Sequence, residues 1–371
     1  MVPVFSEEQT ELRQTVRRFC EEKFPEAVVR RVMETDEGFD AAAWQQMAQQ
    51  LGLQSLAIPE EFGGAGFSLA EQGIVMEELG RSLGPTPFLS TVVLAANLLI
   101  AVDDAPAKEE ILAAIAAGES RAAVAFLELS QNWDEDGIQA SAERGADGWA
   151  LSGTKTNVID GHTADLLLVL ARTSKGISVF RVDPRAAGVR ATAVETLDLT
   201  RKQAIVVLDN APAELIGSEG AGWEALEQML LAASVALASE NVGGALKLLE
   251  LSAEYARTRE QFGKVIGSYQ AIKQKLADVL LDVELARAAA HRVARAASEH
   301  DPALPQEAAM AHALTADTFV KAAYEAIQVH GGIGFTWEHP AHLYFRRAKS
   351  NELLFGTPDH QREVAARHLG L

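Results

Sequence analysis

The segment Tyr255-Ala-Arg-Thr-Arg-Glu-Gln-Phe-Gly-Lys264, followed by Ile266-Gly-Ser-Tyr-Gln-Ala-Ile272, joins two long helical patterns. It places Arg259, Phe262 and Gln270 close together at a bend. A guanidinium pairs bidentately with phosphate, and an aromatic ring offers a stacking face. The segment therefore suits a nucleotide diphosphate.

The same segment has a plainer interpretation as a connection between two helices. Basic residues stand near a helix C-terminus, the helical pattern breaks at Gly263, and it restarts after Gly267. The residues of this segment alone leave both interpretations open.

The composition is that of a globular protein of more than one domain. The chain has 371 residues, of which 48% are apolar and 23% charged. An excess of 52 acidic over 33 basic residues gives a formal net charge of -19. Such a surface repels a phosphate backbone, so we expect no nucleic-acid partner. Any anionic ligand must bind where a few Arg and Lys residues are concentrated.

The cysteine content and the N-terminus indicate the compartment. Cys20 is the single cysteine, so no internal disulfide can form, and no metal-ligand or thiol-redox motif surrounds it. The first residues lack the basic and apolar regions of a signal peptide, and no run of 18 apolar residues is apparent. We therefore expect a cytoplasmic protein without a membrane partner.

Helical, β and helical patterns follow one another along the chain. Residues 6 to about 120 show successive helical patterns. Short β-prone runs follow at 122–127, 149–152, 166–171, 177–182 and 204–208, with the spacing of a sandwich or barrel. Helical patterns then return with the spacing of a four-helix bundle. The sequence predicts a mainly α, α+β chain with an N-terminal helical domain (1–120), a middle β domain (121–221) and a C-terminal helical bundle (222–371).

Motifs in the C-terminal half resemble those of the acyl-CoA dehydrogenase family, and the resemblance extends over nearly the whole chain. They are Arg259-Glu-Gln-Phe-Gly263 with Gln270, then Gln328-Val-His-Gly-Gly-Ile-Gly-Phe335, then Arg346-Arg-Ala-Lys349 leading to Gly356-Thr357. The resemblance implies a helical domain, a β domain and a C-terminal helical bundle. It also implies FAD in a cleft, a glutamate that removes the α proton of an acyl-CoA thioester, and hydride transfer from the β carbon to the flavin.

The resemblance also assigns residues to FAD. It implies that the ADP half of the cofactor is contacted by Arg259, Phe262, Gln270, Gln328, Gly331 and Gly332, and it adds Thr357 to the cofactor site. Paired glycines expose backbone N–H groups without a Cβ in the way, so a pyrophosphate can approach, and they can cap a helix at the same time. In this family these contacts are made to the cofactor of the neighbouring subunit.

Residues that face the flavin in this family are replaced as a set. The loop that usually reads Thr-Glu-Pro followed by Ala-Gly-Ser is here Leu127-Glu-Leu-Ser-Gln-Asn132. The usual Trp-Ile-Thr triplet is here Asn157-Val158-Ile159. Loss of the threonine removes a hydroxyl donor, and loss of the tryptophan removes a flat packing face.

The family's catalytic base is replaced as well. The common Tyr-Glu-Gly-Thr motif reads Leu354-Phe355-Gly356-Thr357, so phenylalanine stands at the position of the carboxylate. Some members carry the glutamate near the start of the first bundle helix, where this chain has Ala233 and Ser234. Neither phenylalanine nor alanine can accept a proton.

Glu240 is the carboxylate that could still act as a base. It lies on an otherwise apolar helical pattern, and a buried glutamate there would have a raised pKa suited to a base. Alternatively, Glu240 bonds structurally to a neighbouring helix or to Asn241.

Three hypotheses for function follow from this pattern. The leading one is a non-catalytic chain that resembles the base-lacking chains of α2β2 acyl-CoA dehydrogenases acting on steroid side chains. A homologous catalytic chain would then hold both the flavin and the acyl-CoA. The alternatives are a self-sufficient homo-oligomeric acyl-CoA dehydrogenase that uses Glu240 or another base, and a non-enzymatic helical interaction protein that has lost FAD.

Overall fold

The computed structural model describes residues 5–146 and 148–371. The start of the expected N-terminal domain (residues 1–4) and Asp147 in the expected β domain lie outside the described residues. Contacts group the chain into two compact units, each described by itself. The bundle unit contains the chain up to Arg31, Ser68–Gly84 and Ser234–Leu371, and the barrel unit contains Val32–Phe67 and Pro85–Ala233.

The barrel unit combines short helices with a β-sheet. Its helical elements are α3 (Ala41–Gln49), a π-helix η3 (Phe88–Ala95) that continues into α5 (Ala96–Ala101), and α6 (Ala105–Ala116). Its strands are β1 (Ala122–Ala125), β2 (Ser141–Gly145), β3 (Gly148–Ile159), β4 (Leu166–Thr173), β5 (Gly176–Val182), β6 (Val189–Val194) and β7 (Gln203–Ile216). Helix α2 (Glu26–Met33) crosses from the bundle unit into this one.

The strands form one seven-stranded mixed sheet that closes on itself. Its order is β1-β4-β2-β3-β7-β5, and β5 also pairs with β4, while β6 pairs with β7. Strand β1 runs parallel to β4, whereas β4–β5, β5–β7 and β3–β7 are antiparallel. The spacing of the β-prone runs predicted a sandwich or a barrel, and the structure has the barrel. The sequence did not reveal β2 and β6, because most of their side chains are exposed or half-buried and give no apolar alternation.

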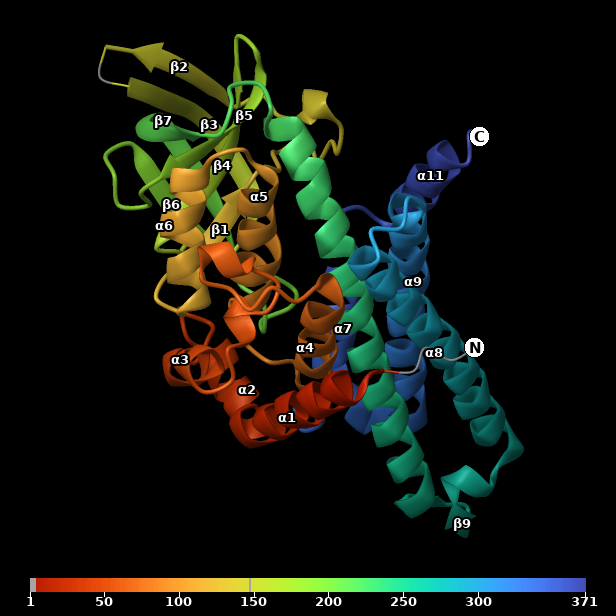
Figure 1. Ribbon diagram of the computed structural model, residues 1–371. Coiled ribbons are helices and arrows are strands. Elements are labelled where there is room, and N and C mark those ends of the chain that lie inside the picture. The colour runs from red at the N-terminus through yellow and green to blue at the C-terminus, as the bar shows by residue number, and fades with distance from the viewer. Residues whose placement is uncertain (1–4, 147) are drawn as a thin grey trace. The chain divides into compact units, whose positions relative to one another are not determined.

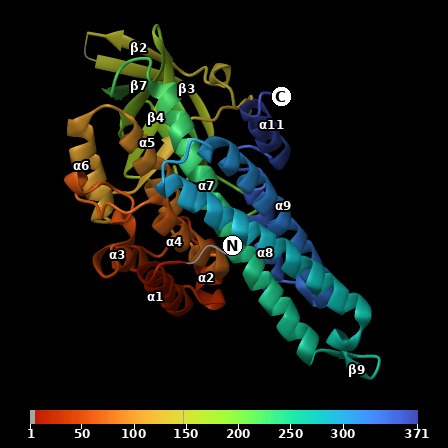
Figure 2. The ribbon, with the colours of Figure 1, turned by 45° about the vertical axis from the view of Figure 1, so that its right-hand side comes forward.

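The bundle unit is built from long helices. They are α1 (Glu7–Lys23), α4 (Leu69–Ser82), α7 (Gly222–Thr258), α8 (Gln270–Ser298), α9 (Leu304–His330), α10 (Ala341–Asn351) and α11 (Pro358–His368). Figures 1 and 2 show α8 beside α9, with a small hairpin, formed by β8 (Glu260–Gln261) and β9 (Lys264–Val265), at the end of α7. The predicted order of helical, β and helical segments is therefore confirmed.

Local chemistry sets several helix ends. The Ser6 hydroxyl accepts a hydrogen bond from the Gln9 backbone N–H, and the Ser6 backbone N–H donates one to the Gln9 side-chain oxygen, which is a capping box for α1. Pro305 lies in the first turn of α9, where a backbone N–H would have no acceptor within the helix, so the missing N–H of proline breaks no hydrogen bond. Gly331, with φ 63°, ends α9 in a conformation that favours glycine.

Helix α7 is long and apolar enough to cross a membrane by length and composition alone. Its most apolar 18-residue window is 83% buried inside the protein. This is the burial of a core helix, so the apolar run is accounted for by packing.

Candidate cofactor and catalytic site

The segment after α7 folds into a tight hairpin. Strand β8 (Glu260–Gln261) pairs with β9 (Lys264–Val265), and the turn consists of Phe262 and Gly263. Both turn residues have positive φ, 54° and 78°, as two-residue hairpins require. Phe262 is uncommon in this region of φ for a bulky residue, and its ring is 92% exposed. The hairpin therefore presents an aromatic face to the outside of the chain.

Arg259 lies at the base of this hairpin. Its backbone N–H donates to the Tyr255 carbonyl at 2.8 Å, and its carbonyl accepts from Ile266 at the same distance. The side chain is exposed, and among the described residues its guanidinium takes part in no ion pair. A cation fixed by its backbone and without a carboxylate partner is suited to an anionic ligand.

Gln270 begins α8 beside the hairpin. The Tyr269 hydroxyl donates to the Gln261 carbonyl at 3.0 Å, and the Lys264 ammonium lies 4.2 Å from the centre of the Tyr269 ring. These contacts fix the hairpin against the start of α8. Gln270 is exposed and so remains available to a ligand.

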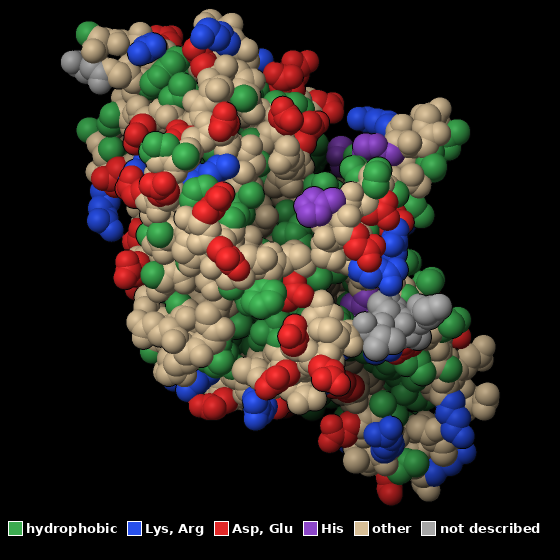
Figure 3. All heavy atoms as spheres, in the orientation of Figure 1, with side chains coloured by type: hydrophobic (Ala, Val, Ile, Leu, Met, Phe, Trp, Pro, Cys, Tyr) green, Lys and Arg blue, Asp and Glu red, His purple; other side chains and the backbone are tan. Residues whose placement is uncertain are grey.

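The C-terminus of α9 lies at the same end of the bundle unit. The rings of Tyr255 on α7 and His330 on α9 are 4.5 Å apart, which brings the two helix ends together. Gln328 is exposed on the last turn of α9. A Cβ added to Gly331 or Gly332 would meet no heavy atom within 4 Å, so both glycines face open space. Figure 3 shows Lys and Arg side chains gathered at the end that carries the β8–β9 hairpin.

Thr357 does not join this cluster within one chain. It is the N-cap of α11, and its hydroxyl accepts from the His360 backbone at 3.3 Å. Arg362 of α11 pairs with Asp317, so α11 packs beside the middle of α9. Gln328 stands eleven residues further along α9, about 16 Å at the rise of an α-helix.

The family position of the base is filled by a buried aromatic ring. Phe355 is 5% exposed, with φ 58°, and Gly356 after it has φ 101°. The Gln361 side-chain amide donates to the Phe355 carbonyl at 2.7 Å and holds this turn in place. The phenylalanine predicted from the motif therefore packs as an ordinary core residue, with no proton-accepting group.

The alternative base position also carries no carboxylate. Ala233, the last residue of the barrel unit, is fully buried. The Ser234 hydroxyl, in the bundle unit, lies 3.3 Å from Nδ1 of His312, whose side chain is also fully buried. Burial, together with the charge of His360, lowers the pKa of His312 to about 4. His312 is thus neutral near pH 7.

Glu240 is enclosed and paired. Its side chain is 1% exposed, and its Oε1 accepts from the guanidinium of Arg347 on α10, which is 3% exposed. A Cβ added to Gly80 of α4 would lie 2.2 Å from the Glu240 carbonyl oxygen, so the two backbones touch here. This geometry fits the structural alternative for Glu240. The sequence signal for it was the second arginine of the Arg346-Arg347 motif.

The loop of the barrel unit that replaces the family's flavin-facing loop keeps a firm anchor. Glu128 Oε1 accepts from the backbone N–H groups of Gln139 and Ala140 at 3.0 and 2.9 Å. It also accepts from the Lys155 ammonium at 2.7 Å. Burial lowers the pKa of Lys155 to about 8, although the Glu128 carboxylate opposes this shift. Sequence reasoning concentrated on the lost side chains and missed this pair.

The replaced triplet keeps a distorted backbone. The β3–β7 register shifts between Lys155 and Val158, and Asn157 inside the shift is exposed with φ 53°. Asparagine tolerates this conformation better than most residues. Val158 and Ile159 are 1% and 4% exposed, so they belong to the buried interior. The only exposed side chain of this triplet is therefore the small amide of Asn157.

Comparison with known proteins decides the family. A model of the C-terminal domain of acyl-CoA dehydrogenases matches residues 220–370, and a model of the N-terminal domain matches residues 6–119. Acyl-CoA dehydrogenase IpdE2 of Mycobacterium tuberculosis is 35% identical over 97% of this chain and 96% of its own length. The chain belongs to the acyl-CoA dehydrogenase family. The short-chain specific mitochondrial acyl-CoA dehydrogenase of Bos taurus is 31% identical over 96% of this chain and 89% of its own length.

Solved acyl-CoA dehydrogenase structures have the same fold. The ChsE4–ChsE5 complex of Mycobacterium tuberculosis contains a chain with a TM-score of 0.89 and 30% identity, covering 99% of this chain and 98% of that one. Butyryl-CoA dehydrogenase from Megasphaera elsdenii gives a TM-score of 0.91 at 25% identity, with both chains fully covered.

FAD is the cofactor of this family, which dehydrogenates acyl-CoA thioesters. The described residues at the end of the bundle unit fit its ADP half. Arg259 offers a guanidinium, and the turn at Gly331 and Gly332 leaves room that a Cβ would fill. Phe262, Gln270 and Gln328 lie exposed around them, and their individual contacts to FAD stay predictions.

Proposed function

We propose that this acyl-CoA dehydrogenase chain is the non-catalytic subunit of a cytoplasmic α2β2 heteromer. It supplies the ADP-binding half of the FAD site to a homologous catalytic chain, which holds the acyl-CoA. The observation that carries the proposal is the absence of a carboxylate at both family base positions together with the confinement of Glu240. Phe355 is buried, Ala233 and Ser234 cannot act as bases of this kind, and Glu240 is paired with Arg347.

The residues at the end of the bundle unit have defined tasks in this proposal. FAD supplies the hydride acceptor of the family's reaction when it is bound. Arg259 pairs with a phosphate oxygen, and Gly331 and Gly332, which have no Cβ, let the pyrophosphate approach the backbone. The Gly331 N–H itself donates to the Gln328 and Ile327 carbonyls at the end of α9. Gln270 and Gln328 add amide donors at the edge. These groups bind and orient the cofactor, whereas proton removal falls to the partner's glutamate.

An exposed apolar stripe supports the presence of a partner chain. Leu281 and Leu285 lie one turn apart on α8 and are 71% and 57% exposed. Apolar side chains that are exposed to water on a monomer are unfavourable, and burial in a subunit interface lowers the free energy. The similarity to a chain of the ChsE4–ChsE5 complex agrees with a homologous partner.

A specific observation argues against each of the two alternative functions. A self-sufficient enzyme using Glu240 would need this carboxylate to reach the substrate, but it is 1% exposed and paired with Arg347. A protein that has lost FAD would not need an accessible Arg259 beside an open glycine turn. The non-catalytic subunit accounts for both features.

Flavin counting tests the proposal. The chain is purified alone, and also together with the acyl-CoA dehydrogenase-like chain that leaves the column with it. Flavin and protein are then quantified by absorbance and amino-acid analysis. We expect little flavin on the chain alone and about two FAD molecules per α2β2 tetramer, because each FAD needs one half-site from each kind of chain. Four flavins per tetramer, or near-stoichiometric flavin on the chain alone, would overturn the proposal.

A further inference from the structure

A pocket of about 290 Å³ lies within the bundle unit, and its lining contains none of the residues assigned to FAD or considered as the base. It is bordered by α1, α2, the last turn of α4, the middle of α7 and the start of α10. Phe24 and Leu343 in its wall are each 2% exposed, and Tyr344 is 5% exposed. The volume is close to the lower end of the range of roughly 300–1,000 Å³ found for small-molecule sites.

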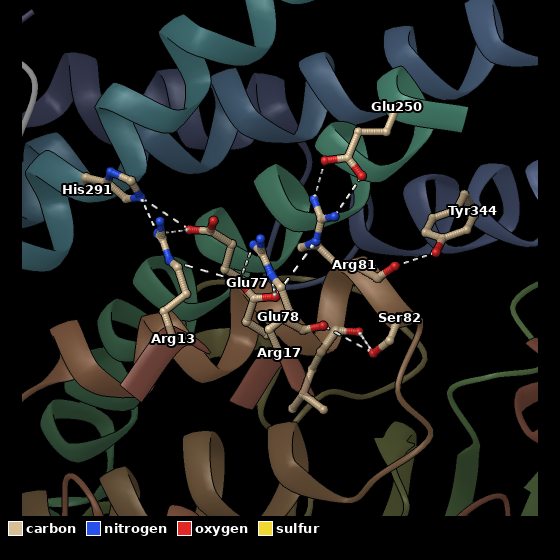
Figure 4. A network of polar contacts seen from close by, with 10 residues as sticks. Arg13, Arg17, Glu77, Glu78, Arg81, Ser82, Glu250, His291 and Tyr344 are labelled. Atoms are coloured by element: carbon tan, nitrogen blue, oxygen red, sulfur yellow. Dashed lines mark hydrogen bonds and ion pairs between the residues drawn. The ribbon is translucent and has the colours of Figure 1, made fainter. Parts of the chain in front are cut away.

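Arginine side chains converge beside this pocket. Figure 4 shows Arg17 and Arg81 directed toward Glu78 of α4. The Glu78 carboxylate, 1% exposed, accepts two hydrogen bonds from Arg17 at 2.9 and 2.8 Å. Arg81 directs its two terminal nitrogens to Glu250 of α7, at 3.0 and 2.7 Å. Arg17 and Glu78 are thus paired with each other, whereas Arg81 bridges two carboxylates: its Nε lies 3.8 Å from Glu78, and its terminal nitrogens bind Glu250.

One counterion of Arg81, Glu250, is open to solvent. Glu250 is 54% exposed, while Arg81 is only 13% exposed. Because the Glu250 carboxylate is the solvent-exposed partner, a carboxylate from solution can exchange with it and keep the two hydrogen bonds of Arg81. Lys247, one turn before Glu250 on α7, also lines the pocket, and among the described residues it takes part in no ion pair.

Acidic residues in the lining limit the charge of a ligand. Glu21 of α1 and Glu26 of α2 line the pocket and are both exposed, with Glu26 paired to Arg30 at 2.7 Å. They would repel a ligand that carries several negative charges. A single negative charge directed toward Arg81 and Lys247 fits this lining.

We propose that this pocket binds an amphiphilic monocarboxylate, a molecule with one carboxylate and a compact hydrocarbon body. The carboxylate accepts a bidentate pair of hydrogen bonds from Arg81 and one from Lys247. The hydrocarbon body covers Phe24, Leu343 and Tyr344. This site is separate from the FAD half-site and does not depend on the proposed subunit role.

Binding here affects a neighbouring helix. Leu343 and Tyr344 belong to the first turn of α10, and the Tyr344 hydroxyl already donates to the Arg81 backbone carbonyl. Burial raises the pKa of Tyr344 above its usual range, so the hydroxyl keeps this proton. A ligand packed against the same turn adds contacts between α10 and α4, and local opening of α10 becomes rarer.

Titration calorimetry on the full chain tests the binding chemistry. Decanoate, below its micelle-forming concentration, is compared with 1-decanol on the parent, on Lys247→Gln and on Leu251→Trp, which places an indole at the pocket lining. Lys175→Gln, an exposed lysine of the barrel unit that pairs with Glu219, is the control. We expect decanoate to bind at least tenfold more tightly than 1-decanol. Both pocket variants should weaken decanoate binding at least tenfold, and Lys175→Gln should not change it.

Hydrogen exchange measured by mass spectrometry locates the ligand. Saturating decanoate should slow exchange of the α10 amides in residues 341–348 in the parent but not in Lys247→Gln. Absence of decanoate binding, equal affinity for 1-decanol, unchanged affinity in both pocket variants, or binding without protection of α10 would each overturn the proposal.

Discussion

Glu240→Leu and Arg347→Met, made singly and together, test whether Glu240 is structural or catalytic. Both side chains are at most 3% exposed, so each single change leaves an unpaired charge in the interior. Breaking a buried ion pair in this way costs about 3–5 kcal/mol, whereas replacing the whole pair by apolar side chains is often close to neutral. We therefore expect each single variant to lose about 3–5 kcal/mol and the double variant to recover most of it.

Urea unfolding of the purified chain, followed by circular dichroism, measures these free energies. Arg362→Met is the matched control, because Arg362 and its partner Asp317 are 53% and 46% exposed and this pair should contribute less than about 1 kcal/mol. Single-turnover bleaching of the flavin in the complex is recorded for Glu240→Gln. A general base contributes a factor of about 10² to 10⁴ in rate, so its loss would slow bleaching by at least about a hundredfold. Unchanged stability of Glu240→Leu together with bleaching slowed a hundredfold in Glu240→Gln would refute the structural reading and restore the self-sufficient enzyme.

Three further changes have defined outcomes. Arg259→Ala or Gln328→Ala should weaken FAD binding by the complex without unfolding it. Loss of the charged contact of Arg259 should cost about 1.5–3 kcal/mol, roughly ten- to a hundredfold in affinity. Unchanged FAD occupancy at limiting FAD would show that these two residues serve only as helix caps. Phe355→Glu assayed without a partner should not oxidise acyl-CoA, because base, substrate and acceptor must be aligned together; turnover would mean that the replaced flavin-facing loop matters less than proposed. The pKa of His312 in the folded chain is about 4, below its ordinary value of 6.5, so the unfolded chain binds this proton first as the pH falls. The free energy of unfolding should therefore be highest above pH 6.5 and should fall by up to about 3 kcal/mol as the pH drops toward 4. His312→Gln should flatten this acid decline in unfolding free energy, and an identical pH profile would contradict the assignment.

The order of segments and many helix ends were readable from the sequence, because they depend on neighbouring residues. The capping box at Ser6, the proline at the start of α9 and the glycine at its end act through backbone hydrogen bonds a few residues away. The bend that carries Arg259 and Phe262 was predicted for the same reason. Family motifs added the position of the replaced base at Phe355, which needs only an aligned sequence.

Pairings between distant residues were decided by the tertiary structure. Glu240 lies 107 residues from Arg347, and Glu128 lies 27 residues from Lys155. Nothing in the local pattern around Glu240 distinguishes a base from one half of an ion pair. Whether a carboxylate faces substrate or a guanidinium depends on which helix packs against it.

The proposed cofactor-binding residues were also predicted from the sequence in part and decided by the tertiary structure in part. The sequence named Arg259 and the two glycines as phosphate-binding groups by their chemistry. The stacking of Tyr255 on His330 brought their helix ends together, and the packing of α11 beside the middle of α9 kept Thr357 apart from them. Residue type sets what a side chain can bind, whereas only the packing of helices fixes which groups meet, because burial and distance are properties of the folded chain.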